Sequence, residues 1–152
     1  MMIYIRLCGV TAMTNWQIVD ARNLGFYMTD EDRDGARFAE CKAIPSVWKI
    51  LKLIALLTAE ERIVFPIRGE TDPEACHHAY AWEEKAVYQR SGNGWSSLPM
   101  RISRKGLAQL VLDNMTEEPN FEGMYTIFRV EKNPRPREVK KLYKNAEETY
   151  ER

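Results

Sequence analysis

Apolar and polar residues alternate with a period of two over residues 2–8, and this alternation predicts a half-buried strand. The predicted strands are residues 2–8, 26–28, 63–67, 86–90 and 124–130. Because Pro66 has no N–H to donate, we expect the strand that contains it to lie at a sheet edge. The turn residues from Ser91 to Gly94 predict a β-hairpin that continues at Trp95.

Other stretches carry apolar residues at helical spacing, or residues that commonly begin a helix. The predicted helices are 36–43, 46–57, 72–84, 104–115 and 136–152. The clearest is 46–57, which is apolar on most sides, so we expect most of its surface to be buried. Asp72-Pro73-Glu74 is typical of a helix start, and Ser103 is a suitable N-cap. Residues 15–23 fit neither period.

These elements follow one another without a regular strand–helix–strand rhythm, which favours the α+β class over a doubly wound sheet. A length of 152 residues fits one domain, and the sequence has no internal repeat or long linker. We therefore expect residues 1–152 to form a single compact α+β domain. Its expected architecture is a small mixed or antiparallel sheet packed with four to five helices.

Composition narrows the class of protein. The chain has 22 basic and 22 acidic residues, which removes the strongest argument for a general nucleic-acid or membrane binder. Its most apolar segment, 44–57, is too short to cross a bilayer as a helix. The three cysteines, Cys8, Cys41 and Cys76, form no close pair and indicate a reducing compartment. We expect a cytoplasmic protein with no membrane partner.

The segment from Asp30 to Gly35 places Asp30, Asp32 and Asp34 at alternate positions, as in the opening of a calcium-binding loop. The twelfth position of such a loop should be glutamate, and here it is Cys41. Arg33 also adds positive charge inside the loop. We therefore interpret the segment as a solvated acidic turn that caps the following helix, and predict no metal and no cofactor.

Cys76-His77-His78 lies in the predicted helix 72–84, where adjacent side chains point about 100° apart and rarely bind one ion together. Either histidine has the chemistry of a base at neutral pH. However, the sequence lacks the nucleophile, zinc-protease and phosphate-loop motifs of common enzymes. These absences favour a protein that is not an enzyme. If the protein is an enzyme, the sequence does not identify its catalytic residues.

Positive charge gathers towards the C-terminus. Residues 129–144 contain seven basic residues and only two acidic ones, Glu131 and Glu138. They are Arg129, Lys132, Arg135, Arg137, Lys140, Lys141 and Lys144. We expect this set to form an electrostatic contact surface for an acidic protein or a phosphate backbone. A solvated helix face is the alternative interpretation.

The sequence therefore leads to a function by elimination. We expect a small non-enzymatic binding or regulatory protein, of the inhibitor or adaptor type, that acts by protein–protein contact. The first alternative is a nucleic-acid-binding module that uses the basic C-terminal strand–helix segment. The second is an enzyme whose site lies around His77 and His78.

Overall fold

The computed structural model describes residues 15–72, 76–82, 84–96 and 98–132. In chain order the elements are α1 (Asn15–Asn23), β1 (Tyr27–Met28), β2 (Arg37–Cys41), α2 (Val47–Ile54), β3 (Glu61–Pro66), β4 (His77–Ala81), β5 (Ala86–Ser91), β6 (Gly94–Trp95), β7 (Met100–Arg101), α3 (Arg104–Asp113) and β8 (Tyr125–Lys132). The predicted strand 2–8 and the predicted helix 136–152 lie outside these residues.

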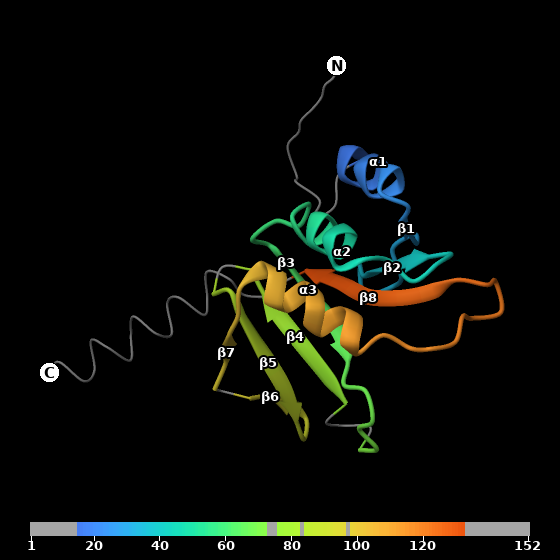
Figure 1. Ribbon diagram of the computed structural model, residues 1–152. Coiled ribbons are helices and arrows are strands. Elements are labelled where there is room, and N and C mark those ends of the chain that lie inside the picture. The colour runs from blue at the N-terminus through green and yellow to red at the C-terminus, as the bar shows by residue number, and fades with distance from the viewer. Residues whose placement is uncertain (1–14, 73–75, 83, 97, 133–152) are drawn as a thin grey trace, which may run out of the picture.

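The strands form one sheet in the order β1-β2-β8-β3-β4-β5-β6, and β7 pairs with β5 beside this path (Figure 1). Every pair of neighbouring strands is antiparallel. The strands from β3 to β6 follow one another as hairpins. In contrast, β8 comes from far along the chain and lies between β2 and β3.

The expected fold class is wrong. The described residues form eight antiparallel strands in one sheet with three helices, rather than a small sheet packed with four to five helices. Two predicted helices, 36–43 and 72–84, contain the strands β2 and β4 instead. Each of these strands is held by hydrogen bonds to strands on both sides, and this pairing overrides a local helix signal.

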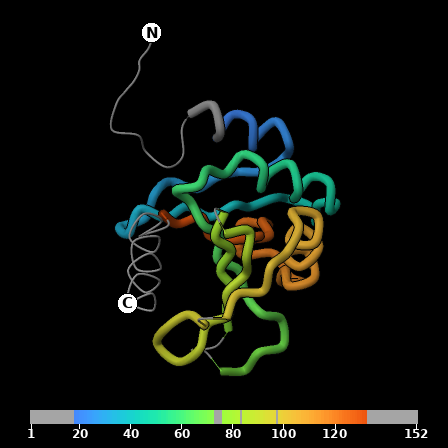
Figure 2. The backbone as a smooth tube through the Cα atoms, turned by 90° about the vertical axis from the view of Figure 1, so that its left-hand side faces the viewer, coloured from blue at the N-terminus to red at the C-terminus, as the bar shows by residue number. Residues whose placement is uncertain are grey.

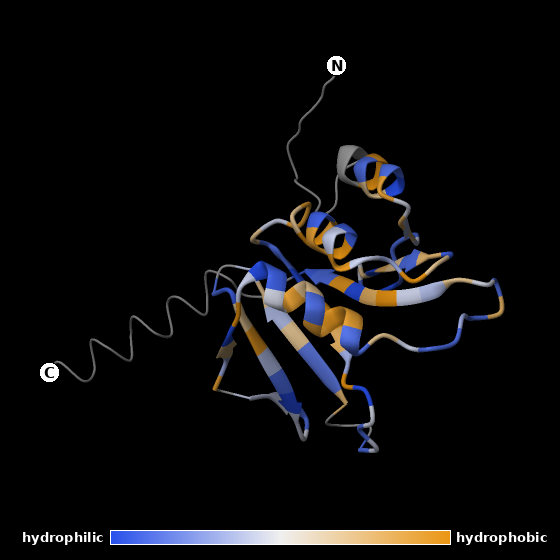
Figure 3. Cartoon of the chain, viewed as in Figure 1, coloured by the Kyte–Doolittle hydropathy of each residue, from blue (hydrophilic) through white to orange (hydrophobic). Residues whose placement is uncertain are grey.

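The predicted helices 46–57 and 104–115 are confirmed in α2 and α3, as is the N-cap at Ser103, and Ser46 is a second cap that was not predicted. Ser46 Oγ accepts the Lys49 N–H at 3.3 Å at the start of α2, and Ser103 Oγ accepts the Gly106 N–H at 3.1 Å at the start of α3. Trp48 is 63% exposed, so α2 is buried on one face rather than on most of its surface. Figure 3, coloured by hydropathy, shows that apolar and hydrophilic residues alternate along both helices.

A single hydrophobic cluster joins the helices to one face of the sheet. It contains Ile50 and Ile54 of α2, Leu107 and Val111 of α3, and Phe65 of β3. These side chains are almost wholly buried, and their removal from water is the main favourable term in folding. The described residues therefore make one compact unit with one core.

Two turn signals have different outcomes. The predicted hairpin is confirmed, because Arg90 pairs with Trp95 and Gly92 takes a φ of +59° at the turn. The predicted edge position of the Pro66 strand is wrong, because β3 lies between β8 and β4. Pro66 is the last residue of β3, so its missing N–H falls at the end of the strand rather than within it.

Candidate functional site

The two faces of the sheet differ. Ile63, Tyr80, Val87 and Val130 are aligned across four strands, and all belong to the core beneath the helices. Their sequence neighbours form the next row and point to the opposite side, because successive side chains of a strand alternate. No helix of the described residues packs on that side, which we call the helix-free face. Its larger residues are Phe38, Arg62, His77, Tyr88, Arg90, Trp95, Arg129 and Glu131.

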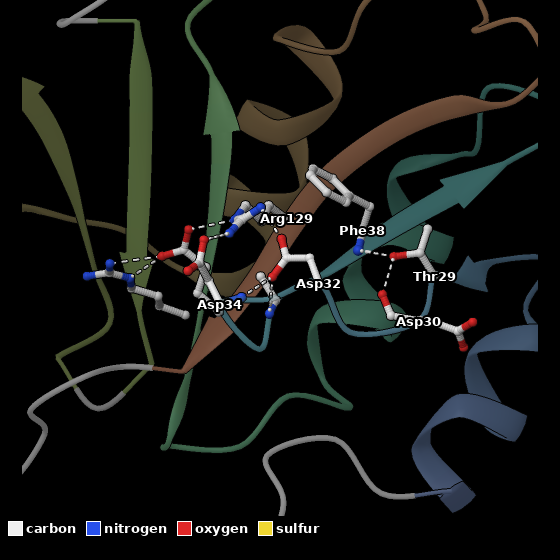
Figure 4. Close-up of polar contacts among 9 residues, drawn as sticks. Thr29, Asp30, Asp32, Asp34, Phe38 and Arg129 are labelled. Atoms are coloured by element: carbon white, nitrogen blue, oxygen red, sulfur yellow. Dashed lines mark hydrogen bonds and ion pairs between the residues drawn. The ribbon is translucent and has the colours of Figure 1, made fainter.

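Arginines and carboxylates alternate across this face. Arg62 donates from Nε and Nη2 to Glu131 Oε1 at 3.1 and 2.9 Å. Glu131 Oε2 accepts from Arg129 Nε at 2.8 Å, and Arg129 Nη1 donates to Asp32 Oδ2 at 2.8 Å. Figure 4 shows Arg129 between β8 and the loop that holds Asp32 and Asp34. We call Arg62, Glu131, Arg129 and Asp32 the charge ladder.

The loop between β1 and β2 is built to present Asp32 to Arg129. Asp32 Oδ1 accepts the N–H groups of Asp34 and Ala36 at 2.9 and 3.0 Å, and Gly35 turns the chain with a φ of +78°. The hydrogen bond from Ala36 is the largest cause that lowers the pKa of Asp32, with Arg129 adding to it. Burial acts to lower the pKa of Arg129, but its bonds to Glu131 and Asp32 outweigh this and raise it. Both groups are therefore held in their charged forms.

This loop corrects the sequence interpretation of the acidic segment. The turn precedes strand β2 and caps no helix. Asp32 uses one oxygen for backbone amides and the other for Arg129, so a cation would have to displace these contacts. Within the described ranges, no group of three histidine, cysteine or acidic side chains could hold a metal ion. Asp32 and Asp34 thus face Arg129 of the charge ladder, whereas the Asp30 side chain has no contact with the ladder.

The second part of the helix-free face is aromatic. The guanidinium carbons of Arg62 and Arg90 lie 5.8 and 5.9 Å from the centre of the Trp95 ring, within the range of cation–π attraction. His77 belongs to the same region, because the charge of Arg90 contributes to its lowered pKa. Burial is the larger cause of that lowering, and Glu131 acts against it. His77 is therefore mostly neutral near pH 7.

The two histidines are not brought together. They are adjacent on β4, so they lie on opposite faces of the sheet. His78 is partly buried on the core side of the sheet against Phe65, with ring centres 5.1 Å apart, and burial lowers its pKa. His77 Nδ1 lies 3.0 Å from Cys76 Sγ. A thiol–imidazole pair can move a proton, but no carboxylate of the described residues is hydrogen-bonded to His77 to orient it as a catalytic base.

The predicted C-terminal contact surface is described only in part. Arg129 and Lys132 belong to β8, whereas the remaining members lie outside the described residues. Those members are Arg135, Arg137, Lys140, Lys141 and Lys144, and for them the surface stays a prediction. Arg129 already forms ion pairs with Asp32, Asp34 and Glu131.

Sequence reasoning missed Arg62, Arg90 and Trp95. The hairpin prediction contained a usable signal, because a two-residue turn places Arg90 directly opposite Trp95. Nothing local predicts that Arg62 joins them, since its strand is brought in through β4.

Comparisons of the chain with protein-family models, curated proteins and solved structures gave no match. None of the helices in the described ranges is both long enough and apolar enough to cross a membrane. The function must therefore be argued from the residues of the helix-free face.

Proposed function

We propose that this chain is a non-enzymatic protein of the inhibitor or adaptor type that binds another protein through its helix-free face. The observation that supports this proposal is the gathering of partly exposed arginine and aromatic side chains there, with the guanidinium groups of Arg62 and Arg90 both near the ring of Trp95. Arginine, tryptophan and tyrosine are enriched at the energetically important positions of protein interfaces.

The charge of the face favours a protein over a nucleic acid as the partner. Arg62 and Arg129 are paired with Glu131 and Asp32, and Asp34 Oδ2 lies 3.9 Å from Arg129. A surface that tracks a phosphate backbone needs cations without such partners, because it binds by releasing counterions. A mixed surface of paired charges and aromatic rings is more typical of protein contacts.

Site-specific photo-crosslinking with the full chain tests this proposal. Benzoylphenylalanine replaces Tyr88 on the helix-free face or Gln109, an exposed residue of α3, and each protein is irradiated in a nuclease-treated extract of its native cells. We expect one discrete protein adduct at position 88 that excess unlabelled chain competes away, and none at 109. Adducts of equal yield at both positions, or adducts only with nucleic acid before nuclease treatment, would contradict the proposal.

A further inference from the structure

Arg90 differs from the other arginines on its side of the sheet. Arg62 and Arg129 bind carboxylates, and Arg101 at the β7 edge donates to the Glu84 carbonyl oxygen at 3.2 Å. The Arg90 side chain has no hydrogen bond or ion pair with any of the residues that the structure describes, although its backbone pairs with Trp95, and its guanidinium carbon lies 5.9 Å from the centre of the Trp95 ring. The residue is half-buried, and its guanidinium has N–H groups that no acceptor in the described ranges uses.

The hairpin holds Arg90 in a fixed place. Arg90 lies opposite Trp95 in the β5–β6 pair, and Gly92 allows the tight turn that joins them. Figure 2 shows this hairpin on the side of the molecule away from α3. Because Arg62 approaches the same ring and is held in turn by Glu131, the Trp95 side chain is packed between two defined groups. The guanidinium of Arg90 is thus positioned before any partner binds.

We propose that Arg90, supported by Trp95, binds a carboxylate in an acidic segment of the partner protein. This inference rests on the proposed function and names the chemistry of its partner. A guanidinium that lies about 6 Å from an aromatic ring keeps its N–H groups free to meet both oxygens of a carboxylate. Arg62 cannot serve in the same way, because its Nε and Nη2 already donate to Glu131.

The neighbouring acids select an acidic side chain over a phosphate backbone. Arg62 and Arg129 are already paired with Glu131, Asp32 and Asp34 on or beside the same face, so a continuous polyanion that follows the face would meet few unpaired cations. A glutamate or aspartate side chain of a peptide needs only the guanidinium of Arg90.

The two histidines provide a direct measurement. The chain contains only His77 and His78, so imidazole NMR signals can be assigned with two substitutions. The charge of Arg90 helps to lower the pKa of His77, whereas burial alone is the cause at His78. A carboxylate bound at Arg90 should therefore raise the pKa of His77 and leave that of His78 unchanged, which makes His78 an internal control for the fold.

The experiment titrates the full chain with three probes: a 12-residue peptide of alternating glutamate and serine, its counterpart with glutamine, and a 12-nucleotide oligothymidylate. We expect only the glutamate peptide to raise the pKa of His77 and to saturate. Arg90→Gln should weaken its binding about tenfold or more, Arg90→Lys by less, and Arg22→Gln on α1 not at all. Binding of both peptides alike, preference for the oligonucleotide, no saturable binding, or full binding by Arg90→Gln would overturn the inference.

The two proposals fail in different ways. If crosslinking at position 88 captures a protein and Arg90→Gln leaves that capture unchanged, the carboxylate inference is wrong while the protein-binding function stands. If crosslinking yields no protein at position 88, the proposed function fails whatever the peptide titration shows.

Discussion

Arg129 and Asp32 are 97 residues apart in sequence and joined by a hydrogen bond of 2.8 Å. This contact ties the loop between β1 and β2 to the middle of the sheet, on the face opposite the helices. The same arginine is hydrogen-bonded to Glu131, so a single side chain links the loop to the charge ladder.

Replacing this arginine should destabilise the fold. Arg129→Met removes its bonds to Asp32 and Glu131, and the free energy of unfolding should fall by about 1–3 kcal/mol because charged acceptors lose their donor. Urea denaturation measures the change. Lys132→Met, at the exposed end of the same strand, is the matched control and should change stability by less than about 0.5 kcal/mol. Equal effects of the two substitutions would contradict the importance of the charge ladder.

The packing of α2 predicts a contrast between two neighbouring turns of one helix. Ile54 is 0% exposed in the core, so Ile54→Ala should lower the free energy of unfolding by about 2–5 kcal/mol through lost burial and a cavity. Leu51 is only partly buried against the same cluster, and Leu51→Ala should cost less. Thermal and urea unfolding, followed by circular dichroism, compare the two. A larger loss at Leu51 would mean that the helix faces the sheet differently.

Glu61 predicts a dependence of stability on pH. Burial raises the pKa of Glu61 above its ordinary value of 4.5, although the backbone N–H and hydroxyl of Thr58 act against this. As pH rises above 4.5, Glu61 loses its proton in the unfolded chain before it does so in the folded chain. The free energy of unfolding therefore falls as pH rises from 4.5 through the raised pKa of folded Glu61. Glu61→Gln should therefore gain stability relative to the wild type between pH 4.5 and 7.

Glu122→Gln is the control for that experiment, because Glu122 is exposed and is not among the groups that shift the pKa of Glu61. Unfolding by urea at a series of pH values should give parallel curves for this variant and the wild type. If the curve of stability against pH for Glu61→Gln were also parallel to that of the wild type, Glu61 would have the same pKa in the folded and unfolded chains, and the prediction would be wrong.

The turn that supports Arg90 and Trp95 is sensitive at one glycine. Gly92 has a φ of +59°, which residues with a Cβ rarely adopt, so Gly92→Ala should destabilise the hairpin by about 1 kcal/mol. Gly94→Ala is the matched control, since Gly94 has no positive φ and an added Cβ would meet nothing within 4 Å. Hydrogen exchange of the β5 and β6 amides should rise in the first variant and not in the second.

Local signals were sufficient for part of the fold. Ser46 and Ser103 each carry a capping hydroxyl next to an apolar stripe, and the Ser91–Gly94 turn contains its own glycines, so helices α2 and α3 and the β5–β6 hairpin could be predicted. Strands β2 and β4 could not, because β2 pairs with β8 from far along the chain, and Asp72-Pro73-Glu74 predicts a helix over the segment that contains β4.

The candidate site was predicted less well for the same reason. The sequence singled out Asp32 as a candidate metal ligand and Arg129 as part of an electrostatic surface. In the structure the two side chains form an ion pair with each other. Such a pairing depends on strand order, which neither composition nor periodicity determines.

The position of β8 has a consequence for the order in which the protein can fold. Until residues 125–132 leave the ribosome, β2 and β3 have no strand between them, and each presents a row of unpaired backbone groups. The hairpins from β3 to β6 can form early, because their contacts are local, but joining them to the β1–β2 pair requires long-range contacts that close slowly. Nascent chains that stop before β8 should therefore expose two open sheet edges and depend on chaperones to avoid aggregation.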